Sequence, residues 1–167
     1  MPVTAVQVRE LRDKTGAGIM DCKRALEESD GDIAKAEAIL NKKGLASAAK
    51  KAGRSTSEGL VVSYIHTGGR VGSMIELNCE TDFVARTDEF EVLGRNVAMQ
   101  IAAMSPRFVD RDSVPEDAEE VKDEELLLEQ EYIRDSSMKI ADLVTDSIGK
   151  LGENIHIRRF SRFELGG

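Results

Sequence analysis

The chain has 167 residues, of which 41% are hydrophobic and 32% charged, and its formal net charge is −8. This length allows one domain, or a small module followed by a larger domain. With 4% aromatic residues and no tryptophan, the core must consist mainly of Ile, Leu, Val and Ala. The acidic balance argues against general nucleic-acid binding, which requires a basic surface.

The cysteines and the apolar segments indicate the compartment. Cys22 and Cys79 lie far apart without Cys-x-x-Cys spacing, which suits two buried thiols in a reducing environment better than a disulfide scaffold. The N-terminal residues contain no apolar stretch of signal-peptide type, and no segment approaches the length of a membrane span. We therefore expect a cytoplasmic protein that makes no direct contact with nucleic acid or membrane.

Residues 1–53 are predicted to form a module of three short helices. Thr4 and Gln7 have the spacing of a capping box at the start of the first helix. Ile19 begins an apolar stripe that should face inward along the second helix. The third helix follows a Ser-Asp-Gly-Asp turn, and its pattern stops at Gly44.

A linker and a hairpin are predicted next. Residues 46–58 are rich in Ala, Lys and Ser and are expected to be a linker with some helix at its start. This change of composition marks the boundary of a second domain, residues 54–167. Two strands, 60–67 and 70–78, flank Gly68-Gly69, a pair typical of a two-residue turn of the primed type. The second domain is therefore expected to be an α+β core with a small antiparallel sheet.

Helices and one strand complete the predicted core. Thr87 can cap a long helix whose buried stripe extends to Met104. The acidic segment 110–135 is predicted to be helical with a solvated face. A further amphipathic helix covers 137–151. The last strand, 154–165, carries apolar residues on both faces unless a bulge changes their phase.

Residues typical of catalysis are poorly represented. A cysteine nucleophile at Cys79 would need an oriented base, and the two histidines, His66 and His156, stand outside any recognisable catalytic motif. Glu80 and Asp82 supply too few oxygen ligands for a cation site on their own. The residues alone therefore predict a two-domain α+β binding protein with no catalytic, cofactor or metal site.

Three separated blocks of the chain resemble the bacterial translation elongation factor Ts family. They are TGAGIMDCKRAL with GDIAKAEAILNKKG (15–26 and 31–44), NCETDFVART (78–87) and GENIHIRRFSRFELG (152–166). The resemblance implies a ubiquitin-associated-like three-helix module followed by an α+β core with a small antiparallel sheet. It also implies a guanine-nucleotide exchange factor, not an enzyme, which binds the GTPase elongation factor Tu and promotes GDP release.

The resemblance assigns two partner-binding sites. In the family, the loop corresponding to Thr81, Asp82, Phe83 and Val84 enters the GTPase near its Mg²⁺ and phosphate region, with the Phe between partner helices. The module contributes a second contact at the start of its second helix. Since Ile19 is expected to be buried, the candidate residues there are Met20, Lys23 and Arg24.

The resemblance also bears on assembly. This chain looks like the short form of the family, which pairs as a homodimer and gives a two-plus-two complex with the GTPase. A helical excursion between the acidic segment and the final helix is missing. This shortening affects the part of the partner contact that the absent segment would supply.

Alternatives remain open from the residues themselves. A ubiquitin- or peptide-binding protein would account for the three helices but leaves residues 78–87 unexplained. A thiol or metal enzyme would require a depressed pKa at Cys79. Phe83 could fold back and anchor the helix that follows, or it could project as a wedge for the partner. Given the resemblance, and because Phe83 lies on a turn and not on an apolar stripe, we expect it to be exposed in the free protein and to act as the wedge.

Overall fold

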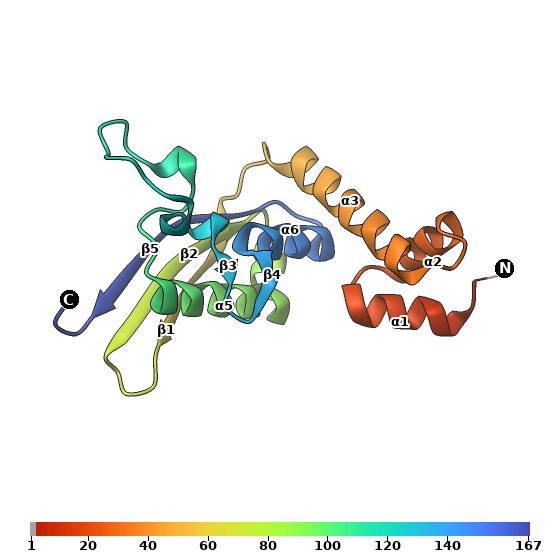
Figure 1. The fold of residues 1–167 in the computed structure, drawn as a ribbon, viewed down its shortest axis with the longest axis horizontal. Coiled ribbons are helices and arrows are strands. Elements are labelled where there is room, and N and C mark those ends of the chain that lie inside the picture. The colour runs from red at the N-terminus through yellow and green to blue at the C-terminus, as the bar shows by residue number, and fades with distance from the viewer. Residues whose placement is uncertain (1–2) are drawn as a thin grey trace.

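The computed structural model describes residues 3–167 and shows an α+β chain, as predicted (Figure 1). Three helices come first: α1 (Ala5–Thr15), α2 (Ile19–Glu28) and α3 (Ile33–Lys51). The core then contains, in order, β1 (Glu58–Ile65), β2 (Val71–Cys79), α4 (Asp82–Ala85), α5 (Asp88–Met104), β3 (Glu131–Tyr132), β4 (Asp135–Lys139), α6 (Ile140–Leu151) and β5 (Ile155–Glu164). Short 3₁₀ turns occupy Arg111–Ser113, Asp123–Glu125 and Leu127–Glu129.

The three N-terminal helices enclose a small core of their own, which we call the N-terminal module. The Thr4 side chain accepts a hydrogen bond from the Gln7 N–H, and the Gln7 side chain accepts one from the Thr4 N–H, so the predicted capping box is confirmed. Five residues are completely buried between the helices: Leu11, Cys22, Ala25, Leu26 and Ala36.

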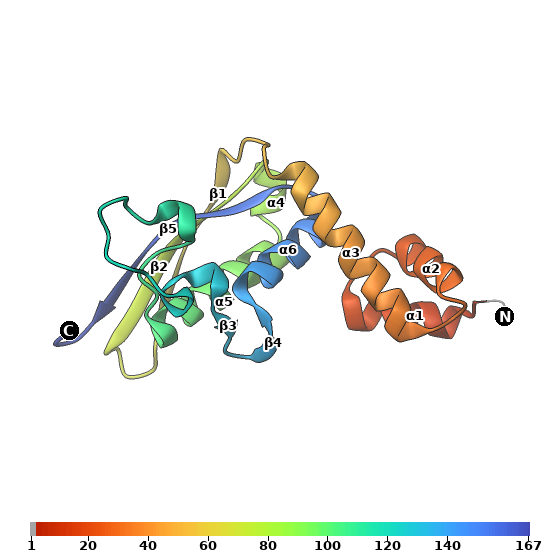
Figure 2. The same ribbon diagram turned by 45° about the horizontal axis from the view of Figure 1, so that its top comes forward.

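Helix α3 continues past the predicted end at Gly44 and stops at Lys51, so the predicted end of this helix was wrong, and the helix expected at the start of the 46–58 linker extends to Lys51. One glycine inside a helix costs about 1 kcal/mol relative to alanine, and the alanine-rich residues that follow favour a helix. Ala48 also packs against the core of the second domain. Figure 2 shows the end of α3 lying beside α6.

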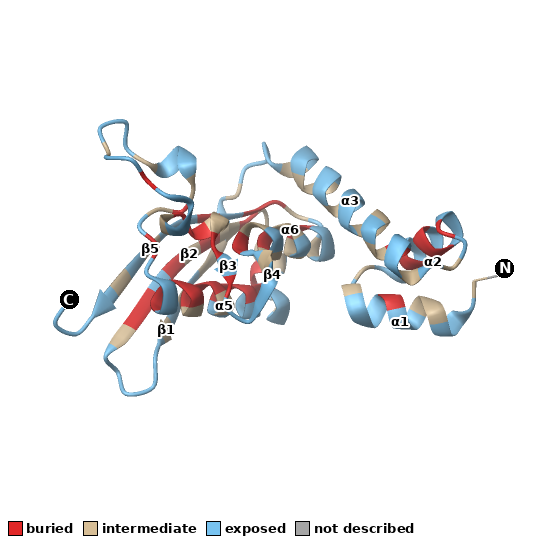
Figure 3. Cartoon of the chain, viewed as in Figure 1, coloured by how far each residue is buried: buried red, intermediate tan, exposed pale blue. Residues whose placement is uncertain are grey.

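The sheet has the order β1-β2-β5 and is antiparallel throughout. Helices α5 and α6 cover one face, and their apolar side chains pack on Ile75, Leu77 and Ile157. A shift of register between Glu76 and Leu77 supplies the bulge that the last strand required. Burial is concentrated between this face and the helices (Figure 3).

The hairpin connection is longer than predicted. The last backbone bond before the turn joins the His66 N–H to the Val71 carbonyl at 2.9 Å, so four residues connect the strands instead of two. Gly68 and Gly69 both have positive φ, of 96° and 69°, a region that glycine occupies without steric cost. The glycine pair was therefore correctly identified as the turn, and the loop length was wrong.

The acidic segment does not form the predicted helix. It forms short 3₁₀ turns joined by irregular segments, and Leu126 and Leu127, at the start of the turn Leu127–Glu129, are buried. The unpredicted β3–β4 hairpin then occupies the residues before Ile140, where α6 begins three residues later than expected. The completely buried Gln100 holds this hairpin, because its side chain accepts from the Ile133 N–H at 3.0 Å and donates to the Glu131 carbonyl at 3.0 Å.

Two further observations concern the exposure of one residue in α5 and the length of the helices. Met104, which was expected to lie in the buried stripe of α5, is 50% exposed because it occupies the last turn of the helix. Within residues 3–167, no helix combines the length and the apolar character that crossing a membrane demands.

Candidate protein-interaction site

The quoted block at residues 78–87 forms a short, capped helical turn between β2 and α5. Thr81 is the N-cap of α4, and its side chain accepts from the Val84 N–H at 3.4 Å. Thr87 closes the turn, because its hydroxyl donates to the Val84 carbonyl at 2.7 Å and also accepts from the Phe90 N–H at 3.3 Å. One residue therefore ends α4 and begins α5.

Phe83 points out of this turn. It is 79% exposed, whereas Ala85 on the same turn is 5% exposed and Val84 packs against the core. The buried Ala85 and the partly buried Val84 fix the turn on the protein, and the aromatic ring is left in solvent. The prediction that Phe83 is exposed in the free protein is confirmed.

Asp82 lies beside Phe83 and is partly exposed. Its carboxylate pairs with the Arg86 guanidinium at 3.1 Å, and both side chains are largely open to solvent. Exposed ion pairs of this kind contribute little to stability. Asp82 can therefore exchange Arg86 for another positively charged group at small cost.

A carboxylate from a distant part of the chain holds the start of the turn. Glu153, between α6 and β5, accepts from the Thr81 N–H at 3.0 Å and from the Thr81 hydroxyl at 2.7 Å. Cys79 lies just before the turn, and its thiol donates to the Thr81 carbonyl at 3.1 Å. Burial, together with the nearby Glu153 charge, raises the pKa of the Cys79 thiol to about 11.

The end of the N-terminal module is attached to the same corner of the core. The buried Asn154 side chain donates to the Arg54 carbonyl at 2.9 Å and to the Ala52 carbonyl at 3.5 Å. The Arg54 guanidinium pairs with Glu80 at 3.6 Å. The segment predicted to be a linker, residues 46–58, is therefore held against the core at Ala52 and Arg54.

The module carries a second exposed apolar surface. Met20 is 58% exposed, and Ile19 is 54% exposed, so the prediction that Ile19 is buried was wrong. Ile19 is the first residue of α2, where the stripe has only just begun and α1 does not cover it. Lys23 and Arg24 are both exposed on the same helix, and Lys23 lies 3.8 Å from Glu27.

An apolar groove lies next to this surface. It has a volume of about 560 Å³ and is lined by Val3, Ala5, Val8, Arg9, Arg12, Asp13, Ile19 and Lys23. Its apolar floor and its mostly basic rim could take an apolar side chain from an acidic partner surface.

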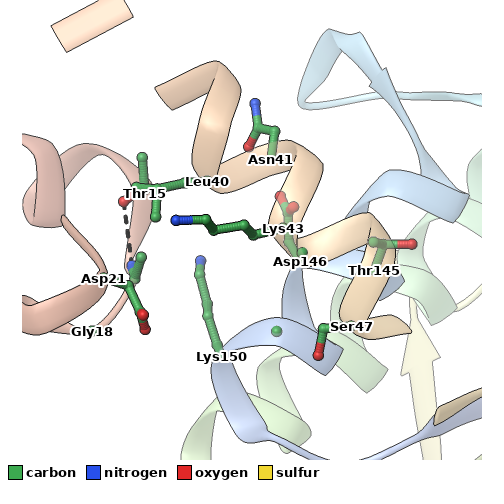
Figure 4. Close-up of a pocket in the computed structure, with 13 residues that line it drawn as sticks. Thr15, Gly18, Asp21, Leu40, Asn41, Lys43, Ser47, Thr145, Asp146 and Lys150 are labelled. Carbon is green, nitrogen blue, oxygen red and sulfur yellow. Dashed lines mark hydrogen bonds between the residues drawn. The ribbon is translucent and has the colours of Figure 1, made fainter. Parts of the chain in front are cut away.

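A second cavity lies where the module meets α6 (Figure 4). It has a volume of about 290 Å³, and Lys43 of α3 and Lys150 of α6 both extend into it. Asp21 and Asp146 also line it, so the charges offset one another. Burial raises the pKa of Asp146 above its ordinary value, and this pocket contains neither histidine nor cysteine.

The structure separates the residues that a thiol enzyme would need to bring together. Cys79 is at one end of β2 and pairs with Glu58, whereas His66 follows Ile65, which pairs with Gly72 at the other end. The two ends are seven residue steps apart along the strand, or roughly 24 Å at about 3.4 Å per step. A raised thiol pKa also opposes nucleophilic reactivity. Among residues 3–167, no group of three or more His, Cys, Asp or Glu side chains is placed to hold a metal.

Sequence reasoning found the exposed turn but missed the residues that fix it. Glu153 and Asn154 are part of the quoted GENIHIRRF block, yet neither was given a role. Their partners are 72 to 102 positions away in the chain. No local pattern indicates which residues these side chains bind. The available signal for Glu153 and Asn154 was the Gly-Glu-Asn sequence that follows a predicted helix.

Two exposed apolar surfaces on a chain of this architecture are typical of the class of proteins that bind another protein. The sequence model of the family described as Elongation factor TS matches residues 37–132. Elongation factor Ts of Anaeromyxobacter sp. (strain K) is 50% identical over 194 aligned positions, which cover 98% of this chain and 89% of that protein. Elongation factor Ts of Fervidobacterium nodosum is 48% identical over 196 positions, covering 99% of this chain and all of that protein. The chain belongs to the elongation factor Ts family of translation elongation factors.

The comparison also gives a lower limit for the number of positions that this chain lacks relative to a family member. The alignment with the Fervidobacterium nodosum protein has 196 positions, and the chain has 167 residues, so at least 29 positions have no counterpart here. Between α5 and α6, residues 105–139 form short 3₁₀ turns and the β3–β4 hairpin.

Proposed function

We propose that this protein is a guanine-nucleotide exchange factor for elongation factor Tu in the cytoplasm. Phe83 carries the proposal, because a large aromatic residue that is 79% exposed on a turn fixed at both ends is suited to insertion into a partner. Aromatic anchors of this kind dominate the energy of many interfaces. The family membership makes the GTPase of translation elongation the partner to test first.

The proposed mechanism needs no covalent chemistry. Mg²⁺ bridges the phosphates of a bound nucleotide and requires near-octahedral geometry. If Phe83 enters between helices of the GTPase beside Asp82, a small displacement of those helices weakens the metal site and the nucleotide together. A factor that binds the empty GTPase more tightly than the GDP-bound form must lower GDP affinity by the same ratio.

The module supplies the second proposed contact. Met20 and Ile19 offer an exposed apolar pair beside the groove on α1 and α2. Lys23 and Arg24 place positive charge around it, which would steer an acidic surface of the GTPase toward the module. This contact would contribute affinity and orientation, while the turn at residues 81–84 performs the exchange.

The uncovered face of the sheet supports a homodimer. Val61, Ile65, Met74 and Phe163 are each 48% to 76% exposed on this face. Beside them, Glu76 pairs with Arg158 and with Arg159, each at 3.1 Å. Packing two such faces would bury the apolar residues and give the two-plus-two complex with the GTPase.

The direct test is GDP release. Elongation factor Tu is loaded with a fluorescent GDP analogue, and release is followed after addition of excess unlabelled GDP with and without this protein. We expect release to accelerate with protein concentration to a plateau. An unchanged rate at saturating protein, with binding absent as well, would refute the proposed function.

A further inference from the structure

We propose that Glu153 is a positioning residue that holds the Phe83 turn in the conformation that engages the partner. The inference rests on the proposed function of the turn, although the contacts themselves are properties of the free protein. Glu153 lies outside the 78–87 block and reaches it from the junction of α6 and β5.

The turn cannot maintain its shape through its own bonds. Helix α4 has only four residues, and the first helical turn is the costly step of helix formation. Phe83 adds little, because most of its surface is in solvent. An ordered turn of this length therefore depends on contacts with the rest of the protein.

Glu153 supplies such a contact through both carboxylate oxygens. Oε1 accepts from the Thr81 N–H at 3.0 Å, and Oε2 accepts from the Thr81 hydroxyl at 2.7 Å. A hydroxyl has one proton, so donation to Glu153 leaves its lone pairs for the Val84 N–H, which lies 3.4 Å away. The carboxylate thus orients the cap, and the cap orients the first turn of α4.

The carboxylate is itself held in place. Gly152 ends α6 in the left-handed region at φ 76°, and Ile155 begins β5 on the other side. Between them, the buried Asn154 is bonded to the backbone at the end of the N-terminal module. Glu153 therefore transfers the rigidity of the core and the module to the turn that carries Phe83.

The first experiment measures hydrogen exchange of backbone amides in the free protein. Glu153→Gln preserves the shape of the side chain but leaves one acceptor oxygen where two are needed. We expect amides 84–87 to exchange roughly tenfold faster, equivalent to about 1.4 kcal/mol, while β2 amides keep their protection. Glu116→Gln, in the exposed acidic segment, makes the same charge change and should alter neither region. Unchanged exchange at 84–87 in Glu153→Gln would overturn the inference.

The second experiment measures stimulated GDP release over a range of protein concentrations. If the turn is loosened while the module surface is intact, the plateau rate should fall by up to about tenfold, the equivalent of the same 1.4 kcal/mol lost from the exchange step, with the half-saturating concentration changed by less than about twofold. A faster-exchanging turn with an unchanged plateau would also refute the positioning role. If even the unmodified protein fails to stimulate release, the proposed function fails, and hydrogen exchange still decides what Glu153 does.

Thr81 variants test the same contact from its other side. Thr81→Val removes the hydroxyl and should reproduce the local loss of protection seen with Glu153→Gln. Thr81→Ser keeps the hydroxyl and should restore protection close to that of the unmodified protein. If Glu153→Gln does not fold, this pair still decides the question, because equal exchange in the two variants would contradict the role of the hydroxyl–carboxylate bond.

Discussion

Phe83→Ala should separate a wedge from an anchor. An aromatic side chain has about 150–250 Å² of surface, and Phe83 is 79% exposed, so roughly 40 Å² is buried in the free protein. At about 25 cal/mol per Å², the substitution should cost at most about 1 kcal/mol of folding free energy. Truncation of a buried Phe costs about 3–5 kcal/mol.

Binding to the partner should respond much more strongly. Burying the remaining surface of roughly 160 Å² would contribute up to about 4 kcal/mol, and a hot-spot truncation costs about 2 kcal/mol or more. A loss of 2 kcal/mol from the exchange step slows stimulated GDP release by about 30-fold. Asp82→Ala should give a milder loss of release rate.

The assay pairs thermal unfolding of each variant with stimulated GDP release at a fixed GTPase concentration. Phe90→Ala is the buried control, since Phe90 is completely buried, and it should be strongly destabilised. Val92→Ala is the exposed control, since Val92 is 54% exposed on α5, and it should change neither quantity appreciably. A Phe83→Ala protein that unfolds much more easily yet stimulates release normally while folded would refute the wedge.

Four further predictions concern other parts of the molecule. Met20→Ala should raise the half-saturating protein concentration for GDP release severalfold, by about 1 kcal/mol, and leave the plateau rate almost unchanged. The unmodified protein should sediment as a dimer, and Phe163→Asp, on the uncovered sheet face, should sediment as a monomer at the same concentration. Since a pKa of about 11 lies two units above the usual 9.0, Cys79 should have about 100-fold less thiolate at pH 8 than a free thiol, and labelling with iodoacetamide should require denaturant. Asp146→Asn should raise the unfolding temperature at pH 7, because the raised carboxyl pKa means that ionised Asp146 opposes folding there; this gain should shrink as the pH falls toward 4 and the carboxyl becomes protonated.

Local chemistry was enough to predict the caps and most strands of the fold. The Thr4 capping box, the Thr87 cap and the glycine pair between β1 and β2 each depend on neighbouring residues, and all three are present. Helix α3 passes Gly44 because packing beyond it offsets the cost of one glycine. The composition of the acidic segment predicted a solvated helix. Its Leu126 and Leu127 are instead buried by residues that come together only when the chain folds.

In the candidate site, too, local sequence predicted some features, and contacts between distant residues were missed. Phe83 was predicted to be exposed because it lies off any apolar stripe, and it is. Ile19 was assigned to a stripe that continues along α2, but at the first position of the helix no neighbouring element covers it. Glu153 could not be recognised, because its bonds to Thr81 join residues 72 positions apart.

The attachment of the N-terminal module changes how its contribution should be understood. A flexible linker would make the module a tethered second site, with an effective concentration set by linker length. Instead, α3 extends to Lys51 and lies against α6, and Asn154 holds the backbone that follows. The Met20 surface and Phe83 are therefore presented together, and their spacing is set by packing. In the proposed complex, a fixed arrangement of these two surfaces would lower the entropy lost on binding.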